Sequence, residues 1–199
     1  MRSAVLYILF MMHLTLFAQP AITGDRFNNY YYLKNVLIEG ETNINSFNFL
    51  FNNSKINIIP VKEKKTNTSD KNDIVEFFIP VRAFKGSNCL METDFQELLK
   101  SHDYPMVKVG IERKKLNGLV SEDGNSKLSF YLTIAGITKL IDGNYLINLC
   151  GENEIMLQGS TQVKLTDFSI SPPKKMLGVL QVKDLIFIKF DIIISTLNS

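Results

Sequence analysis

Apolar and polar residues alternate with a period of two along most of this chain, the pattern of β-strands that bury one face. At least six strands are predicted. Because so many strands leave edges that must be covered, we expect the sheet to close into a single antiparallel barrel. The alternating sets are Phe47, Phe49 and Phe51; Val75, Phe77, Ile79 and Val81; Leu128, Phe130, Leu132 and Ile134; Tyr145, Ile147 and Leu149; Ile155, Leu157, Thr161, Val163 and Leu165; and Ile186, Ile188, Phe190, Ile192 and Ile194.

The segments between these runs are rich in Asn, Asp, Gly, Pro and charged residues, which favour turns. Lys62–Asn72 has almost no apolar residue, so it is predicted to be a surface loop. The predicted breaks are Asn52-Asn53, Lys62–Asn72, Asp123-Gly124-Asn125, Asp142-Gly143-Asn144 and Ser171-Pro172-Pro173.

One segment, Leu90–Lys100, instead has the periodicity of an amphipathic α-helix. Its apolar residues form a single stripe, and Ser87 or Asn88 is placed to cap its start. A lone helix among strands must bury that stripe against the sheet or across one end of the barrel. The stripe consists of Met91, Phe95, Leu98 and Leu99.

The first residues have the parts of a secretory signal: Arg2, an apolar run from Ala4 to Phe17, and the small residue Ala18. We expect cleavage after Ala18 and export to the periplasm or the medium, with a retained anchor as the alternative. The predicted organisation is a signal peptide (1–18), a lead-in (19–32) and one barrel domain (33–196). Leu185–Leu197 is broken by charges, so no integral membrane segment is expected in the mature chain.

The net charge limits which partners are expected, and the cysteine content limits the disulfides. The formal net charge is +2, and +1 without Arg2, which is far from the basic balance of most nucleic-acid-binding proteins. No nucleic acid is therefore expected as a partner. Cys89 and Cys150 are the only cysteines. They could pair in an exported chain, but two thiols do not make a disulfide framework.

Four segments, in this order, resemble the YceI-like family of lipocalin-like, polyisoprenoid-binding β-barrel proteins, in particular its Bacteroidetes-type members. The resemblance implies a mainly β fold, a single antiparallel lipocalin-like barrel with one inserted amphipathic helix, and a lipid held in an apolar interior. The segments are Gly40–Phe49, taken as the first barrel strand; Ile79–Pro105, in which a strand, the helix and Tyr104-Pro105 follow one another; Leu132–Lys139, taken as the central hairpin; and Leu165–Gly178 with Val182-Lys183-Asp184.

The chain also departs from the family pattern. Many members carry histidines where this sequence has Asn45 and Ala135, so any role of those histidines is absent here. An isoprenoid or an isoprenoid quinone is the ligand that the resemblance implies, but lipid identity does not transfer between relatives, because side-chain volume shapes the interior.

The predicted ligand site is an elongated apolar pocket. Each buried CH₂ group of a ligand would contribute about 0.8 kcal/mol. The alternative is that the same residues simply fill the core, since alternating faces build sheets with or without a cavity. The predicted lining is Phe77, Phe84, Met91, Phe95, Leu98, Leu99, Phe130, Leu132, Phe168 and Met176.

Arg82 and Lys85 flank Phe84 and are candidates for binding an anionic head group at the pocket mouth, with an ordinary solvated pair as the alternative. Catalysis is not expected. One histidine, His102, remains after loss of the leader, so no His-based metal cluster is possible, and nothing beyond closeness in sequence places it near Cys89. Asp94 and Glu97 are better explained by a solvated helix face than by acid–base chemistry.

The sequence leaves three functions open. The first is non-enzymatic binding of a long apolar molecule inside the barrel. The second is a solid-cored module that binds a protein partner or surface polymer through Lys62–Asn72 and Asp167–Gly178. The third is an enzyme. A continuous void inside the barrel would favour the first over the second.

Overall fold

Nine strands and two α-helices make up most of the computed structural model of this protein, which describes residues 29–52, 73–119, 126–151 and 154–196. The predicted signal peptide and the loop 62–72 lie outside the described residues. The strands are β1 (Asn29–Thr42), β2 (Ser46–Asn52), β3 (Ile74–Pro80), β4 (Met106–Glu112), β5 (Ser126–Ile134), β6 (Ile137–Leu149), β7 (Glu154–Lys164), β8 (Lys174–Lys175) and β9 (Leu180–Thr196).

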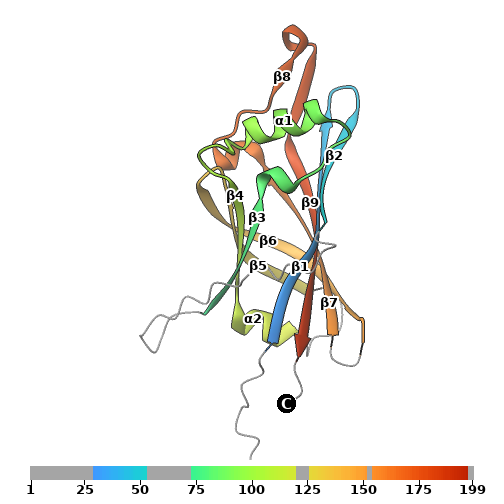
Figure 1. The fold of residues 1–199 in the computed structure, drawn as a ribbon, viewed down its shortest axis with the longest axis vertical. Helices are drawn as coiled ribbons and strands as arrows, with labels where there is room; N and C mark the ends of the chain where they lie inside the picture. Colours follow the sequence, from blue (N-terminus) through green and yellow to red (C-terminus); the bar gives the residue numbers. More distant parts are fainter. Residues whose placement is uncertain (1–28, 53–72, 120–125, 152–153, 197–199) are drawn as a thin grey trace, which may run out of the picture.

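Eight strands form one antiparallel sheet in the order β2-β1-β9-β7-β6-β5-β4-β3, and the short β8 pairs with β9 at one end. The sheet curls around a common axis, with the strands running along the length of the molecule (Figure 1). The predicted fold class, a mainly β antiparallel barrel with an inserted amphipathic helix, is confirmed.

The sheet ends at β2 and β3, and β2 is linked to the segment that follows β3 in the chain. Among the described residues, β2 and β3 do not form a ladder. One bridge joins Leu50 to Lys85, with N–H···O distances of 2.9 and 2.8 Å. Aromatic rings pack beside this bridge: Phe49 stacks on Phe95 of the following helix at 4.2 Å between centroids, and Phe51 lies 5.9 Å from Phe84. Side-chain packing therefore closes the barrel where backbone pairing is nearly absent.

The predicted helix is present as α1 (Cys89–Leu98) and lies across one end of the barrel, drawn uppermost in Figure 1. Asn88 is its N-cap, and its side-chain oxygen accepts a hydrogen bond from the Met91 N–H at 2.9 Å. Glu92 stands in the first turn, where a carboxylate suits the helix dipole.

The opposite end of the barrel is filled by a second helix, α2 (Arg113–Gly118), which the sequence analysis did not predict. Leu116 on α2 is completely buried. The Tyr31 hydroxyl donates a hydrogen bond of 2.6 Å to Asn117, and the Arg113 guanidinium lies over the Tyr31 ring and pairs with Asp73. These contacts fix α2 to β1 and to the start of β3.

Strand β1 begins at Asn29, four residues before the predicted start of the barrel at 33. Its register shifts between Leu33 and Asn35, which is a β-bulge at Lys34. The bulge changes which residues face inward and hides the alternation in the sequence. Gly40–Phe49, taken from the resemblance as one strand, is instead the end of β1, a turn and the start of β2.

The predicted break at Asp142-Gly143-Asn144 is wrong, because these residues lie inside β6. Gly143 is needed there for space: a Cβ at this position would lie 3.2 Å from a ring carbon of Phe130 on β5. Glycine in a strand often marks such a close approach rather than a turn. The predicted break at Ser171-Pro172-Pro173 does lie outside the strands.

Candidate functional site

A cavity of about 620 Å³ occupies the upper half of the barrel, beneath α1. Its size falls within the roughly 300–1,000 Å³ typical of small-molecule sites. Its walls come from the inward faces of the strands and are almost entirely apolar. They include Leu33, Val36 and Ile38 on β1; Val107 and Val109 on β4; Phe130, Leu132 and Ile134 on β5; Val163 on β7; and Val182, Ile186, Ile188, Phe190 and Ile192 on β9.

The burial of inward residues shows where packing ends and the hollow begins. Ile38 and Ile188 pair across β1 and β9 and face inward, yet both are only partly buried, because their side chains border empty space. Towards α2, the inward residues Tyr145, Leu157 and Ile194 are at most 1% exposed. The lower half is therefore a packed core, while the upper half is hollow.

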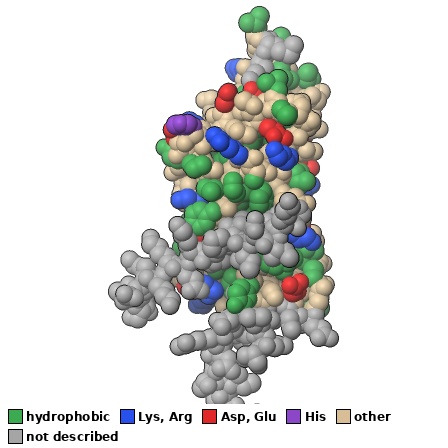
Figure 2. Space-filling model, viewed as in Figure 1, with side chains coloured by type: hydrophobic (Ala, Val, Ile, Leu, Met, Phe, Trp, Pro, Cys, Tyr) green, Lys and Arg blue, Asp and Glu red, His purple; other side chains and the backbone are tan. Residues whose placement is uncertain are grey.

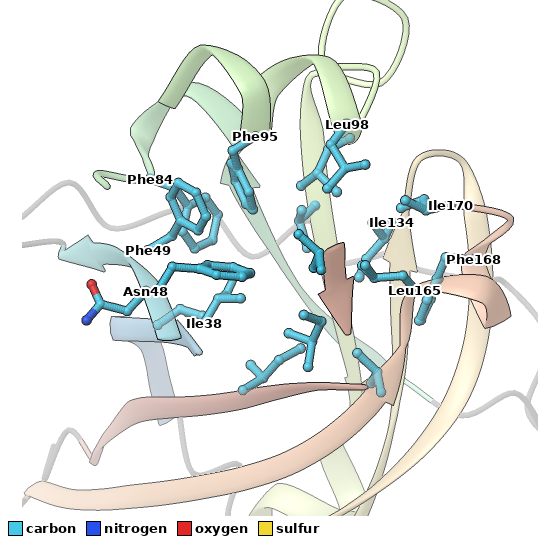
Figure 3. Close-up of a pocket in the computed structure, with 18 of the residues that line it drawn as sticks. Ile38, Asn48, Phe49, Phe84, Phe95, Leu98, Ile134, Leu165, Phe168 and Ile170 are labelled. Carbon is cyan, nitrogen blue, oxygen red and sulfur yellow. The ribbon is translucent and has the colours of Figure 1, made fainter. Parts of the chain in front are cut away.

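Helix α1 forms the roof of the cavity. Phe95 and Leu98 point from α1 into the space, with Phe84 and Phe49 on one side and Ile170, Phe168 and Leu165 on the other (Figure 3). Leu99 is 5% exposed and also lines the cavity. The apolar stripe of α1 therefore faces the hollow, as an amphipathic helix on an apolar interior must.

On the side of the cavity opposite Phe84 and Phe49, a carboxylate fixes the position of the wall. The 3₁₀ helix η3 (Leu165–Phe168) carries Leu165 and Phe168 into the cavity. Asp184 on β9 accepts hydrogen bonds from the Thr166 hydroxyl at 2.7 Å and the Thr166 N–H at 2.9 Å. These bonds stabilise the carboxylate and hold the pKa of Asp184 below its usual value.

The structure brings most of the predicted pocket residues together. Phe77 is an exception, since it is fully buried but lies in the packed core below the cavity. The side chain of Met176 falls outside the described part of the structure. Eight predicted residues line the cavity: Phe84, Met91, Phe95, Leu98, Leu99, Phe130, Leu132 and Phe168.

The two head-group candidates do not reach the cavity. Arg82 is exposed and is absent from the lining. Lys85 is also exposed, and its ammonium pairs with Glu92 at 3.0 Å on the outer surface. Both flank Phe84, whose own side chain turns inward and leaves the two cations outside. Their positions match the alternative, an ordinary solvated pair of cations at the surface.

The polar residues at the mouth of the cavity are not the two cations that the sequence predicted there. Asp94 and Glu97, predicted to lie on a solvated face, border the cavity together with Asn45, Ser46 and Ser87. No lysine or arginine is found among the described lining residues. Deeper inside, Thr161 is buried, but its hydroxyl donates to the Asp142 carbonyl at 2.8 Å, so it leaves no unmet polar group.

Most of the wall was not predicted from the sequence, namely the contributions of β1, β2, β3, β4, β7 and β9. The alternation on β9 was recognised, but nothing in it separates residues that border a cavity from residues that fill a core. On β1 the bulge at Lys34 hid the pattern.

Groups that could support catalysis are not gathered in the described residues. No cluster of three or more His, Cys, Asp or Glu side chains able to hold a metal ion is found there. His102 is 96% exposed and contacts Asp103 at 3.0 Å. Cys89 at the start of α1 and Cys150 after β6 are free and exposed, at opposite ends of the barrel.

Solved structures with a similar fold identify the architecture. A polyisoprenoid binding domain from Saccharophagus degradans, implicated in plant cell wall breakdown, matches 84% of this chain and 99% of its own, with 12% identity and a TM-score of 0.58. Burkholderia cenocepacia BcnA matches 79% of this chain and 95% of its own, with 15% identity and a TM-score of 0.53. This chain shares its fold with these proteins.

The YCEI protein of Campylobacter jejuni covers 65% of this chain and 74% of its own, at 18% identity and a TM-score of 0.48. No family model and no curated protein matches the sequence. At these identities the likeness establishes the fold, and the fold that the resemblance to the YceI-like family implied is confirmed by the first two structures.

No helix in the described part of the chain is both long enough and apolar enough to cross a membrane.

Proposed function

We propose that this protein is an exported, non-enzymatic binding protein that holds a long apolar molecule, such as an isoprenoid, in the upper half of its barrel. The observation that carries the proposal is the cavity of about 620 Å³ with a continuous apolar wall. Transfer of hydrocarbon from water into such a space is favourable by about 25 cal/mol for each Å² of apolar surface buried. The fold shared with a polyisoprenoid binding domain supports the same ligand class.

The mouth suggests what kind of head group the ligand carries. Asp94 and Glu97 place carboxylates at the rim, and the cations Arg82 and Lys85 lie away from it. A phosphate at this position would meet like charge without a partner, which is unfavourable. Hydroxyl and amide groups of Asn45, Ser46 and Ser87 suit an uncharged polar head. An isoprenoid alcohol therefore fits the rim better than an isoprenoid phosphate.

The alternative of a solid-cored module that binds a protein or polymer through its loops requires a filled interior. The hollow in the upper half of the barrel counts against it. An enzyme would need convergent polar groups inside the cavity. The buried polar residues of the described lining are Thr42 and Thr161, and their hydroxyls donate to Asn45 and to the Asp142 carbonyl. Neither alternative is favoured by a specific observation.

A cavity-filling substitution tests the proposal. Ile188 borders the hollow, whereas Leu185 on the same strand is 38% exposed and does not line it. The assay is the fluorescence of the long polyene parinaric acid, used as its uncharged methyl ester because the rim carries carboxylates, added to the purified protein. We expect Ile188→Trp to weaken binding more than tenfold, because the indole occupies the space of the ligand, and Leu185→Trp to leave it unchanged. Equal binding by both variants and the wild type would refute an internal site.

The head-group assignment is tested by competition. Geranylgeraniol and geranylgeranyl diphosphate share one hydrocarbon chain. A difference between the concentrations at which they compete therefore measures how the rim interacts with the head group. We expect the alcohol to displace the parinaric probe at a lower concentration than the diphosphate. The double variant Glu97→Gln, Asp94→Asn should reduce this difference in concentration. A diphosphate that competes better than the alcohol in the wild type would contradict the assignment while leaving the apolar site intact.

A further inference from the structure

Exposed apolar side chains gather on two loops that project beyond the mouth of the cavity. Leu177 and Val179 lie in the turn between β8 and β9; Leu177 is fully exposed and Val179 is 66% exposed. Ile44, in the turn between β1 and β2, is 71% exposed. Apolar atoms form the outermost point of the molecule at its upper end (Figure 2). We call Ile44, Leu177 and Val179 the apolar tip.

Hydrogen bonds lock the two loops of the apolar tip together. The Asn43 side-chain amide donates to the Val179 carbonyl at 2.8 Å, and its oxygen accepts from the Gln181 N–H at 3.0 Å. The Asn43 N–H donates to the Gln181 carbonyl at 3.0 Å, and the Gln181 side chain donates to the Gly178 carbonyl at 2.9 Å. The tip is therefore a defined surface, because these bonds hold both loops in place.

The backbone at Leu177 adds a second observation. Leu177 has φ 56° and ψ 30°, in the left-handed region that glycine or asparagine normally occupies. An apolar side chain in a strained backbone conformation, pointing fully into water, stabilises neither the fold nor the core. Such strain is maintained where the exposed group makes contacts outside the folded chain.

We propose that the apolar tip docks on a lipid bilayer that contains anionic phospholipids, with Leu177, Val179 and Ile44 entering the interface. Lys174 and Lys175 immediately precede the tip on β8, and Lys174 is exposed and forms no ion pair among the described residues. A cation such as that of Lys174, next to inserted apolar groups in the sequence, is attracted to the lipid phosphates of an anionic surface. This combination of cations and apolar groups favours a membrane over a protein partner.

The position of the tip fits a bilayer as its partner. Pro173, Leu180 and Val182, which flank the tip in sequence, line the cavity, so apolar surface continues from the tip into the mouth. When this protein docks on the bilayer through the apolar tip, the mouth of its cavity faces the membrane. The docking surface does not depend on the identity of any ligand in the cavity.

The chain contains no tryptophan, so a single introduced indole gives an unambiguous signal. Leu177→Trp places the probe at the tip. Leu149→Trp is the matched control, because Leu149 is 83% exposed at the opposite end of the barrel. On addition of phosphatidylcholine vesicles with phosphatidylglycerol, we expect a blue shift of emission for Leu177→Trp and none for Leu149→Trp. Equal shifts, or no shift in either variant, would overturn the proposal.

Vesicle flotation supplies the affinity. We expect Leu177→Asn, which suits the left-handed backbone but removes the apolar group, to lower the partition coefficient at least about tenfold, and Leu149→Asn to leave it unchanged. Any contribution of residues 4–17 is the same in all variants. Equal partition into vesicles with and without phosphatidylglycerol would overturn the choice of an anionic surface. Unchanged binding of the parinaric probe by Leu177→Asn would separate docking from the proposed ligand site.

Discussion

The ring of Phe190 on β9 lies directly over Gly159 on β7, its partner in the strand register. A Cβ at position 159 would approach the Phe190 ring carbons to 2.1–2.7 Å, which is far inside any normal contact. The glycine therefore gives the ring room to lie flat against the wall. Phe190 also meets Phe130 edge-on, with 5.6 Å between centroids, and both rings line the cavity.

Gly159→Ala is expected to force the Phe190 ring into the cavity. Overpacking of this kind costs about 1–3 kcal/mol of unfolding free energy, and the displaced ring should weaken binding of the parinaric probe. Urea unfolding followed by circular dichroism measures the first effect. Adding Phe190→Leu should restore both stability and binding in part, because leucine does not cover position 159. Wild-type stability and binding in the Gly159→Ala variant would contradict this prediction, because they would show that the Phe190 ring can move without entering the cavity.

The layer between α2 and the barrel makes a prediction about the lower end. Leu116→Ala removes a fully buried side chain from this layer, and we expect a loss of about 2–5 kcal/mol of unfolding free energy. Tyr31→Phe, which removes the hydroxyl bonded to Asn117, should cost about 1 kcal/mol. Both are measured by urea unfolding. Leu90→Ala, at a residue 73% exposed on α1, is the control and should stay within about 0.5 kcal/mol of the wild type.

The hydrogen bonds from Thr166 to Asp184 predict a pH dependence of stability. Because they lower the pKa of Asp184 below its unfolded value of 3.8, the folded state favours the carboxylate. This contribution is fully present above pH 3.8 and is lost as the pH falls through the folded pKa. We therefore expect the wild type to be more stable than Asp184→Asn at pH 7, with the difference shrinking below pH 3.8.

Urea unfolding of the two proteins between pH 7 and pH 3 checks this expectation, since acid effects common to both cancel in the difference. Thr166→Val removes the hydroxyl donor and should reduce the pH dependence that Asp184 contributes. A difference between wild type and Asp184→Asn that stays constant with pH would show that the bond does not depend on the charge.

Alternation along the strands predicted much of the fold, and for a physical reason. Phe130 and Leu132 point inward because successive side chains of a strand point to opposite faces, whatever the rest of the chain does. The cap at Asn88 and the stripe of α1 are equally local properties. Helix α2 was missed because six residues with one buried leucine show no periodicity, and β1 was missed because its bulge at Lys34 changes the phase.

The boundary between core and cavity is not a local property. Phe77 and Ile79 stand two residues apart on the same face of β3 and are both buried, yet Ile79 lines the cavity and Phe77 does not. Which of them meets empty space depends on how far α2 and its neighbours fill the barrel from below. The inward direction of Phe84, which leaves Arg82 and Lys85 outside, likewise follows from packing against Phe51 and Phe95.

Helix α2 and the packed layer around Leu116 close one end of the barrel. If the cavity binds a ligand as we propose, a molecule that is apolar at one end and polar at the other would enter with its apolar end first and leave with its polar end first, through the same opening. A bound ligand would then have to leave before another could enter.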